Sequence, residues 1–162
     1  MDDELKQAHP LRLDGPVKET RAQAEPSAPD SPDSVWFFGD SERLAVELAG
    51  LVAAGTKTAT ACLVWEYEAA REAIPRAGRF SVVTTFAGAP LLVLETTGVV
   101  IQPFDAVDEQ FAFDEGEGDR SLAYWRRAHW SYFSRRCAVL GREPSTAMPV
   151  VCEGFRVAVR AA

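Results

Sequence analysis

A single lysine stands among arginines in residues 35–162. This part of the chain contains twelve arginines and one lysine, Lys57. Lysine can lose its proton when it is withdrawn from water, whereas arginine stays charged. Thr58 and Thr60 follow within three residues, close enough for an amine to activate a hydroxyl as a nucleophile. Lys57 is therefore a candidate catalytic residue; the alternative is that it is a solvated surface charge in a turn, which is the commoner role of a lysine.

A glycine-broken acidic segment is the second candidate for chemistry. Residues 105–119 contain seven acidic residues and no basic residue. Glycines let a backbone approach a ligand closely, so a carboxylate at Glu115 or Glu117 can act there as a general acid or base. In the alternative interpretation, Asp119 caps the helix that follows, and the two glutamates are ordinary acids near its first turn.

The third candidate is a run of arginines interleaved with aromatic residues. Residues 120–142 contain six arginines and no acidic residue. Guanidinium groups bind phosphates and aromatic rings stack on bases, so this surface is a candidate for nucleic acid. The spacing of Trp125, His129 and Phe133 also favours the buried stripe of a helix, and the arginines are then only its solvated face. In that case His129 is a hydrogen-bonded histidine near the core rather than a catalytic one.

Helices and hairpin strands must position these residues. Apolar spacing predicts helices over about residues 42–54 and 122–140, with a helical piece at about 105–111. Alternating and β-branched residues predict strands at about 80–85, 91–101 and 150–159, the first two joined as a hairpin. Residues 56–60 suggest an extended segment, and 61–73 fit either a strand or a helix. The pattern has no βαβ rhythm, so it predicts an α+β fold with a small, largely antiparallel sheet or barrel.

The first 34 residues differ in composition from the rest of the chain. They hold five of the ten prolines, eight acidic residues, four basic residues and no aromatic residue. Such a segment does not bury enough apolar surface to offset the entropy lost on ordering. We therefore expect residues 1–34 to be a disordered extension and residues 35–162 to form one domain, which carries −3 of the net charge of −7.

Several classes of protein lack their signatures in these 162 residues. No run approaches the roughly 18 apolar residues of a membrane-spanning helix, and residues 1–34 lack the apolar core of a signal peptide. Three widely spaced cysteines, Cys62, Cys137 and Cys152, fit reduced thiols, so we expect a cytoplasmic protein. There is no CxxC pair, GxGxxG, Walker loop or GxSxG, so we expect no metal and no cofactor.

Two sequence motifs together resemble those of a known family. The first is Gly55-Thr56-Lys57-Thr58-Ala59-Thr60, followed by Leu63-Val64-Trp65-Glu66-Tyr67-Glu68. The second is Glu115-Gly116-Glu117-Gly118-Asp119-Arg120-Ser121-Leu122, with Trp125 and His129 after it and the strand Pro149-Val150-Val151-Cys152-Glu153 near the end. Over about residues 36–159 the chain resembles the ASCH domain, the activating signal cointegrator homology domain, which is related in fold to the PUA domain.

The resemblance implies a PUA-like, mostly antiparallel β-barrel flanked by helices. In this fold the lysine-threonine turn and the acidic loop face each other across a cleft. The general role suggested for the family is RNA binding, and some bacterial members are similar to ribonucleases or to amidohydrolases that deacylate acetylated cytidine. In those amidohydrolases a lysine accepts a proton, a threonine three residues later is the nucleophile, and a glutamate donates a proton. By motif these residues are Lys57, Thr60 and either Glu115 or Glu117.

The two motifs supply further candidate ligand-binding residues. These are Thr58, Trp65, Glu66, Asp119, Arg120, Ser121, Trp125 and His129. The leading hypothesis is binding of RNA or of a nucleotide or nucleoside ligand in the cleft, with or without ribonuclease activity. An amidohydrolase acting on a modified nucleoside is one alternative. The other is a protein-interaction module that uses the arginine-rich helix 120–140.

Overall fold

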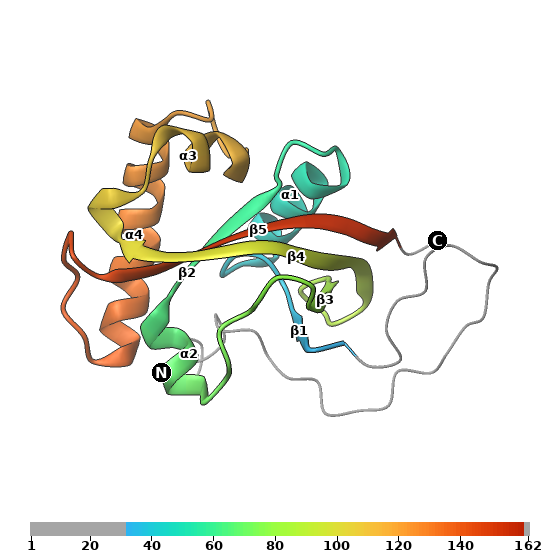
Figure 1. Cartoon of the computed structure of the whole chain (residues 1–162), viewed down its shortest axis with the longest axis horizontal. Coiled ribbons are helices and arrows are strands. Elements are labelled where there is room, and N and C mark those ends of the chain that lie inside the picture. The colour runs from blue at the N-terminus through green and yellow to red at the C-terminus, as the bar shows by residue number, and fades with distance from the viewer. Residues whose placement is uncertain (1–31, 161–162) are drawn as a thin grey trace.

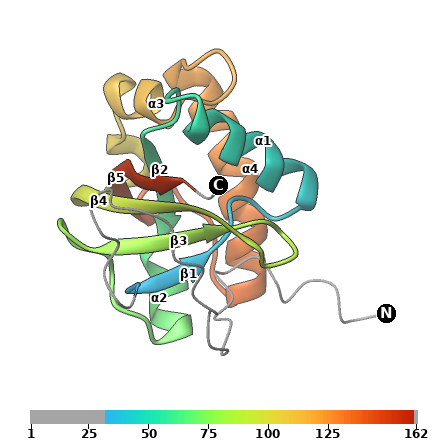
Figure 2. The ribbon, with the colours of Figure 1, turned by 90° about the vertical axis from the view of Figure 1, so that its right-hand side faces the viewer.

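The structure, a computed structural model, describes residues 32–160. These residues form a curled five-stranded sheet with helices packed around it (Figures 1 and 2). Most of the predicted extension, residues 1–31, lies outside this range. In chain order the elements are β1 (Ser34–Trp36), α1 (Glu42–Ala53), β2 (Ala59–Leu63), α2 (Val64–Ala70), β3 (Phe80–Thr84), β4 (Pro90–Pro103), a 3-10 turn (Phe104–Ala106), α3 (Glu109–Glu115), α4 (Leu122–Leu140) and β5 (Pro149–Arg160).

The sheet has the strand order β1-β3-β4-β5-β2 and is antiparallel except at one edge. The long strands β4 and β5 pair from Pro103 opposite Pro149 to Leu92 opposite Arg160, with register shifts that bend both strands. The short strand β1 runs parallel to β3. The curled sheet with its flanking helices confirms the predicted α+β, PUA-like class, and the predicted barrel takes the form of a half-barrel (Figure 2).

Helix α1 begins and ends where its sequence predicts. The Ser41 hydroxyl caps it by accepting a hydrogen bond from the Leu44 amide at 3.3 Å, and Gly55 follows its end with a positive φ. Its apolar face packs on β3, β4 and β5 in one of two core clusters. The buried members of that cluster are Phe38, Leu48, Ala49, Val52, Val83, Leu92, Leu94 and Phe155.

Helix α4, the longest helix, covers the other end of the sheet (Figure 1). Trp125 is 2% exposed and Phe133 is fully buried, which confirms the predicted apolar stripe. The residue that caps this helix is Ser121, whose hydroxyl accepts from the Tyr124 amide at 3.0 Å. The interpretation of Asp119 as the cap is therefore wrong; its carboxylate accepts from the Ser121 amide and shapes the turn before the helix.

Two segments differ from the predicted elements. Residues 61–73 contain both alternatives, because β2 ends at Leu63 and α2 starts at once. The helical piece expected at 105–111 is a 3-10 turn followed by α3, so Glu115 is the last residue of a helix rather than part of a loop. This second difference matters for the site, because a helix end holds Glu115 in one position.

None of the helices in residues 32–160 is both long enough and apolar enough to cross a membrane.

Candidate functional site

Lys57 lies where the chain leaves α1 and enters β2. The Thr56 and Lys57 amides both donate to the Leu51 carbonyl, at 2.9 and 3.1 Å, which wraps this turn back onto α1. The Thr58 amide donates to the Asp114 carbonyl at 2.7 Å. Backbone hydrogen bonds therefore hold residues 56–58, the lysine turn, against the end of α3. The two motifs face each other there, as the family resemblance implies.

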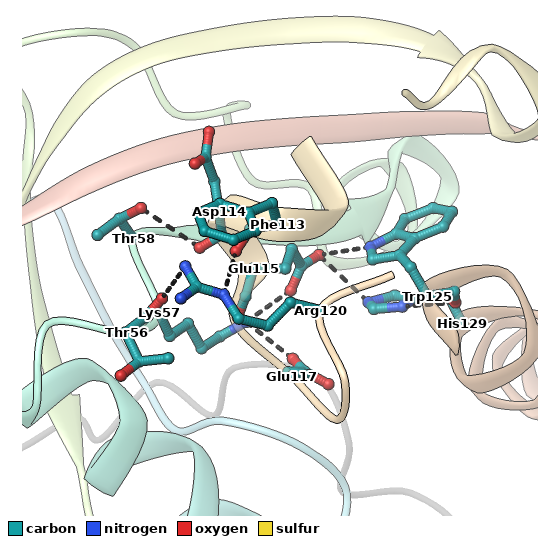
Figure 3. Close-up of polar contacts among 10 residues, drawn as sticks. All are labelled: Thr56, Lys57, Thr58, Phe113, Asp114, Glu115, Glu117, Arg120, Trp125 and His129. Carbon is teal, nitrogen blue, oxygen red and sulfur yellow. Dashed lines mark hydrogen bonds and ion pairs between the residues drawn. The ribbon is translucent and has the colours of Figure 1, made fainter. Parts of the chain in front are cut away.

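The Lys57 side chain is 1% exposed and ends between two carboxylates. Its Nζ donates to Glu115 Oε2 at 2.5 Å and to Glu117 Oε1 at 2.8 Å (Figure 3). A third contact reaches the Glu115 carbonyl at 3.3 Å, and the Phe38 ring centroid lies 5.6 Å away. The interpretation of Lys57 as a solvated surface charge is wrong, because the ammonium is buried and paired.

Glu115 joins the lysine to α4. Its Oε1 atom accepts from Trp125 Nε1 at 3.1 Å and lies 3.2 Å from His129 Nε2, while Oε2 binds Lys57 (Figure 3). The carboxylate is 1% exposed, so its charge is compensated entirely by these neighbours. The alternative in which the glutamates are ordinary first-turn acids is wrong, because Glu115 precedes α4 and is buried beneath it.

His129 is a hydrogen-bonded histidine in the core, as the helical spacing predicts. Its Nδ1 lies 3.1 Å from the Trp125 carbonyl, and its ring stacks on the Trp125 ring with centroids 4.3 Å apart. Nε2 faces the Glu115 carboxylate. Both ring nitrogens therefore point at oxygen acceptors, an arrangement that favours the doubly protonated imidazolium.

The pKa values of Lys57, Glu115 and His129 are each shifted toward the charged form. Burial alone would lower the pKa of Lys57, but the carboxylates of Glu115 and Glu117 outweigh it and the pKa is raised. Burial would raise the pKa of Glu115, yet Lys57 and His129 hold it well below its ordinary value. Burial would lower the pKa of His129, and Glu115 reverses that effect so that the pKa is raised. Lys57 is therefore an ammonium at neutral pH and not a free amine.

A cavity of about 580 Å³ opens beside this network. Thr60, Glu115, Glu117 and His129 all contribute to its lining, so the lysine motif and the acidic motif meet there. Lys57 does not line the cavity and lies behind the two glutamates. The aromatic lining residues are Trp36, Phe37, Phe38, Tyr67, Tyr124 and Tyr132.

The other residues taken from the motifs hold the two segments in place outside the cavity lining. The Arg120 guanidinium lies 3.5 Å from the centroid of the Phe113 ring, and it donates to the Phe113 carbonyl at 3.0 Å and the Thr56 carbonyl at 3.4 Å (Figure 3). The exposed Thr58 hydroxyl donates to the Asp114 carbonyl at 3.3 Å. Ser121 and Asp119 form the turn that starts α4, and Trp125 is a buried donor to Glu115.

Glu66 and Trp65 lie away from the cavity lining as well. Glu66 is 1% exposed and its Oε1 accepts from Arg136 Nε at 2.6 Å, a buried ion pair that ties α2 to α4. Its Oε2 accepts from the Cys62 thiol at 2.9 Å. The Trp65 ring instead packs against the Arg142 guanidinium, 4.9 Å from its centroid.

Sequence reasoning missed Glu153 as a lining residue of the cavity. Glu153 is 7% exposed, comes from β5, and pairs in register with Thr60 on β2. The available signal was an acidic residue inside the apolar strand, flanked by Val151, Cys152 and Phe155. Burying an acid in such a position costs free energy unless the carboxyl group finds hydrogen-bond or charge partners, so an acid there points to a site.

Three of the four arginines of α4 are engaged with the protein itself. Arg136 is buried in its ion pair, Arg135 donates to Asp40 at 2.7 Å, and Arg126 donates to the Asp105 carbonyl at 3.3 Å. They are therefore spread over several directions and do not form one uninterrupted basic face.

Three residues of the network have the chemistry of metal ligands. Glu115, Glu117 and His129 each offer one donor atom, and these atoms lie within 4.8 Å of one another. Lys57 already hydrogen-bonds both carboxylates, so the positive charge that a metal ion would bring is supplied by the ammonium. That the protein works without a metal stays a prediction.

Comparison with known proteins agrees with the motifs. The family model of the ASCH domain matches residues 34–159. An ASCH domain from Lactobacillus crispatus JV V101, known from a crystal structure, is 39% identical in sequence. The match covers 76% of this chain and 78% of that domain's chain, with a TM-score of 0.72. A protein from Enterococcus faecalis V583 is 35% identical and covers 76% of this chain and 74% of its own, with a TM-score of 0.70. A search of curated proteins gives no match. The chain belongs to the ASCH domain family.

Proposed function

We propose that this protein binds a nucleoside or nucleotide, free or as part of RNA, in the cavity beside the Lys57 network. The observation that carries the proposal is that residues of both family motifs, Thr60 and Glu117, meet on the wall of one cavity of about 580 Å³. That volume lies in the range of small-molecule sites. The role suggested for the ASCH family, RNA binding, supports the same ligand class.

The composition of the cavity lining suits this ligand. Aromatic side chains such as Trp36 and Tyr132 offer faces on which a base can stack. Carboxylates and a threonine hydroxyl offer hydrogen bonds to base edges and ribose hydroxyls. The exposed guanidinium groups of Arg71 and Arg76 also line the cavity and can pair with a phosphate.

Glu117 is the member of the network that is best placed to contact the ligand. It is 17% exposed and lines the cavity, while its Oε1 is held by Lys57. Lys57 therefore acts on the ligand indirectly, by fixing the position of Glu117. The buried cation thus lies behind the wall of the site, and the carboxylate makes the contact.

The test is a binding panel on the full chain. Nucleosides, nucleoside monophosphates and short RNAs are titrated by isothermal calorimetry against the wild type, Glu117→Gln and Thr60→Val. We expect at least one ligand class to bind the wild type. Each variant should bind that ligand with an affinity about tenfold lower, the effect of one lost hydrogen bond to a charged or buried group.

An exposed strand threonine provides the matched control. Thr97→Val makes the same chemical change as Thr60→Val at a residue that is exposed and outside the cavity lining. It should bind as the wild type does. Failure of every nucleoside, nucleotide and RNA to bind the wild type, or equal binding by all variants, contradicts the proposal.

Hydrolysis of an acylated nucleoside is the second candidate function. The observation that favours it is that Thr60, which matches the nucleophile of the similar amidohydrolases, lines the same cavity as Glu115 and Glu117, either of which matches their proton donor. The protonated state of Lys57 does not favour its role as proton acceptor. Mass analysis of acetylated nucleosides and of short RNAs after incubation distinguishes amide hydrolysis, RNA cleavage and binding alone. If Thr60 is the nucleophile, Thr60→Val abolishes turnover.

A further inference from the structure

Glu153 is a buried carboxyl group to which the proposed function assigns no contact with the ligand. It lies on β5, is 7% exposed and lines the cavity. Its register partner on β2 is Thr60. Side chains directly opposite in an antiparallel pair lie on the same face of the sheet, so Thr60 and Glu153 project together toward the cavity.

The hydrogen bonding of Glu153 is incomplete within the described chain. A carboxylate offers about four acceptor positions. In residues 32–160 the hydrogen-bond donor found for it is the Thr96 hydroxyl, 2.6 Å from Oε1. This contact fixes one oxygen and leaves the second oxygen, Oε2, with acceptor capacity for a group in the cavity.

Glu153 also lacks a cationic partner, unlike the other buried glutamates. Glu115 is paired with Lys57 and Glu66 with Arg136, whereas no lysine, arginine or histidine in the described part of the chain forms an ion pair with Glu153. Burial consequently raises the pKa of Glu153, an effect that the hydrogen bond from Thr96 only partly offsets. A buried acid without a counter-charge is costly to the fold, and this cost is offset when a ligand supplies donors.

We propose that Glu153 is a specificity-determining residue that selects ligands carrying an amino group on an aromatic heterocycle. The Oε2 atom accepts a hydrogen bond from the amine, while the bond from Thr96 to Oε1 holds the carboxyl group in position. A ligand without that amine leaves a buried acceptor unpaired, which makes discrimination by a polar site strong. The inference rests on the proposed function, because it assigns a contact within the same cavity.

The experiment uses nucleoside pairs that differ only in one amine. Adenosine is compared with purine riboside, guanosine with inosine, and cytidine with 2-pyrimidinone riboside, by calorimetry on the full chain. We expect the wild type to bind the amino member of at least one pair about tenfold or more tightly than its partner. In Glu153→Gln the Thr96 hydroxyl holds the amide oxygen, so the amide nitrogen faces the cavity and the preference falls to within about threefold.

Glu95→Gln is the matched control. It removes the same charge from the sheet, but Glu95 pairs with the exposed Arg156 and lies outside the cavity lining. It should keep the amine preference. Glu153→Asp gives a second variant that retains the charge and withdraws it from the cavity, and it should weaken the preference even if Glu153→Gln folds poorly.

The outcomes separate the two proposals. Binding of nucleosides by the wild type without an amine preference, or a preference that survives in both Glu153 variants, overturns the role of Glu153 and leaves nucleoside binding intact. If only nucleotides bind, the same pairs are compared as their 5′-monophosphates; absence of binding to every nucleoside, nucleotide and RNA overturns both proposals.

Discussion

At the scale of single residues, the centre of the protein is a chain of four charges in contact. Glu117, Lys57, Glu115 and His129 alternate in sign, and each contact between neighbours is 3.2 Å or shorter. Removing one partner from a buried ion pair leaves the other uncompensated, which costs far more than the intact pair contributes. The network therefore stabilises the fold in addition to any role in binding. A variant within it can lose stability as well as affinity for the ligand.

The first prediction concerns Lys57→Met, which keeps an unbranched apolar side chain, one atom shorter, and removes the charge. The variant leaves Glu115 and Glu117 facing each other without the ammonium, so the free energy of unfolding should fall by about 3–5 kcal/mol. Urea unfolding at neutral pH, followed by circular dichroism, measures this change.

A double variant is the control for Lys57→Met. Adding Glu117→Gln removes the carboxylate whose ion pair in residues 32–160 was with Lys57, so part of the lost stability should return. A cost below about 1 kcal/mol for Lys57→Met alone contradicts the ion-pair account. Because this stability loss would mask a binding defect, Thr60 and Glu117 are better tests of function than Lys57.

The second prediction is a pH dependence that comes from His129. Its pKa is raised above the ordinary value of 6.5, so its contribution to stability is complete below that pH and is lost as the pH rises through the folded pKa. The difference in unfolding free energy between the wild type and His129→Gln should therefore be larger at about pH 5.5 than at about pH 9.

Glu115 does not obscure that measurement. Its pKa is lowered, so its contribution is lost only as the pH falls through a folded pKa below the ordinary 4.5. His9, the other histidine, is present in both proteins and cancels in the difference. A stability difference that is unchanged or grows toward high pH contradicts a charged His129.

At the scale of elements, the site depends on the close approach of two chain segments at Gly116. This residue ends α3 with φ of 72°, and a Cβ atom there would lie 2.4 Å from the Thr56 carbonyl oxygen and 2.9 Å from the Lys57 amide nitrogen. Both neighbours are backbone atoms and neither can move aside alone. Glycine thus allows α3 to reach the lysine turn.

The third prediction compares Gly116→Ala with Gly141→Ala. Gly141 ends α4 with a similar φ of 66°, but nothing lies within 4 Å of its added Cβ. Gly141→Ala should lose about 1 kcal/mol from the strained backbone, and Gly116→Ala about 2–4 kcal/mol because the clash adds to the strain. Urea unfolding measures both, and equal losses would show that the two segments do not need this contact.

Elements with strong local signals were predictable from the sequence, and elements that depend on distant partners were not. The capping serine, apolar spacing and terminal glycine define α1 within the chain, and alternating β-branched residues define β3. Strand β1 is three residues long and exists because it pairs with β3, more than 40 residues away. Residues 61–73 were ambiguous because β2 and α2 follow each other without a linker.

At the scale of the whole molecule, the fold converts separate sequence motifs into one cavity. The lysine motif and the acidic motif, 58 residues apart, are joined by direct bonds between Lys57 and Glu115. Their proximity could be expected from the family resemblance and not from composition. The paired state of Lys57 and the position of Glu153 at the cavity could not, because the first follows from the contact of residues 56–58 with the end of α3 and the second from the register of β2 with β5.

The measurement that tests the central claim most directly is a two-dimensional NMR titration of the nitrogen-labelled protein with the tightest ligand of the nucleoside and RNA panel. Binding in the cavity predicts that the largest amide shifts fall around Thr60 in β2, around Glu117 in the loop after α3 and around Glu153 in β5. Shifts confined to the exposed residues of α4, or no shifts with any nucleoside or RNA, would contradict it.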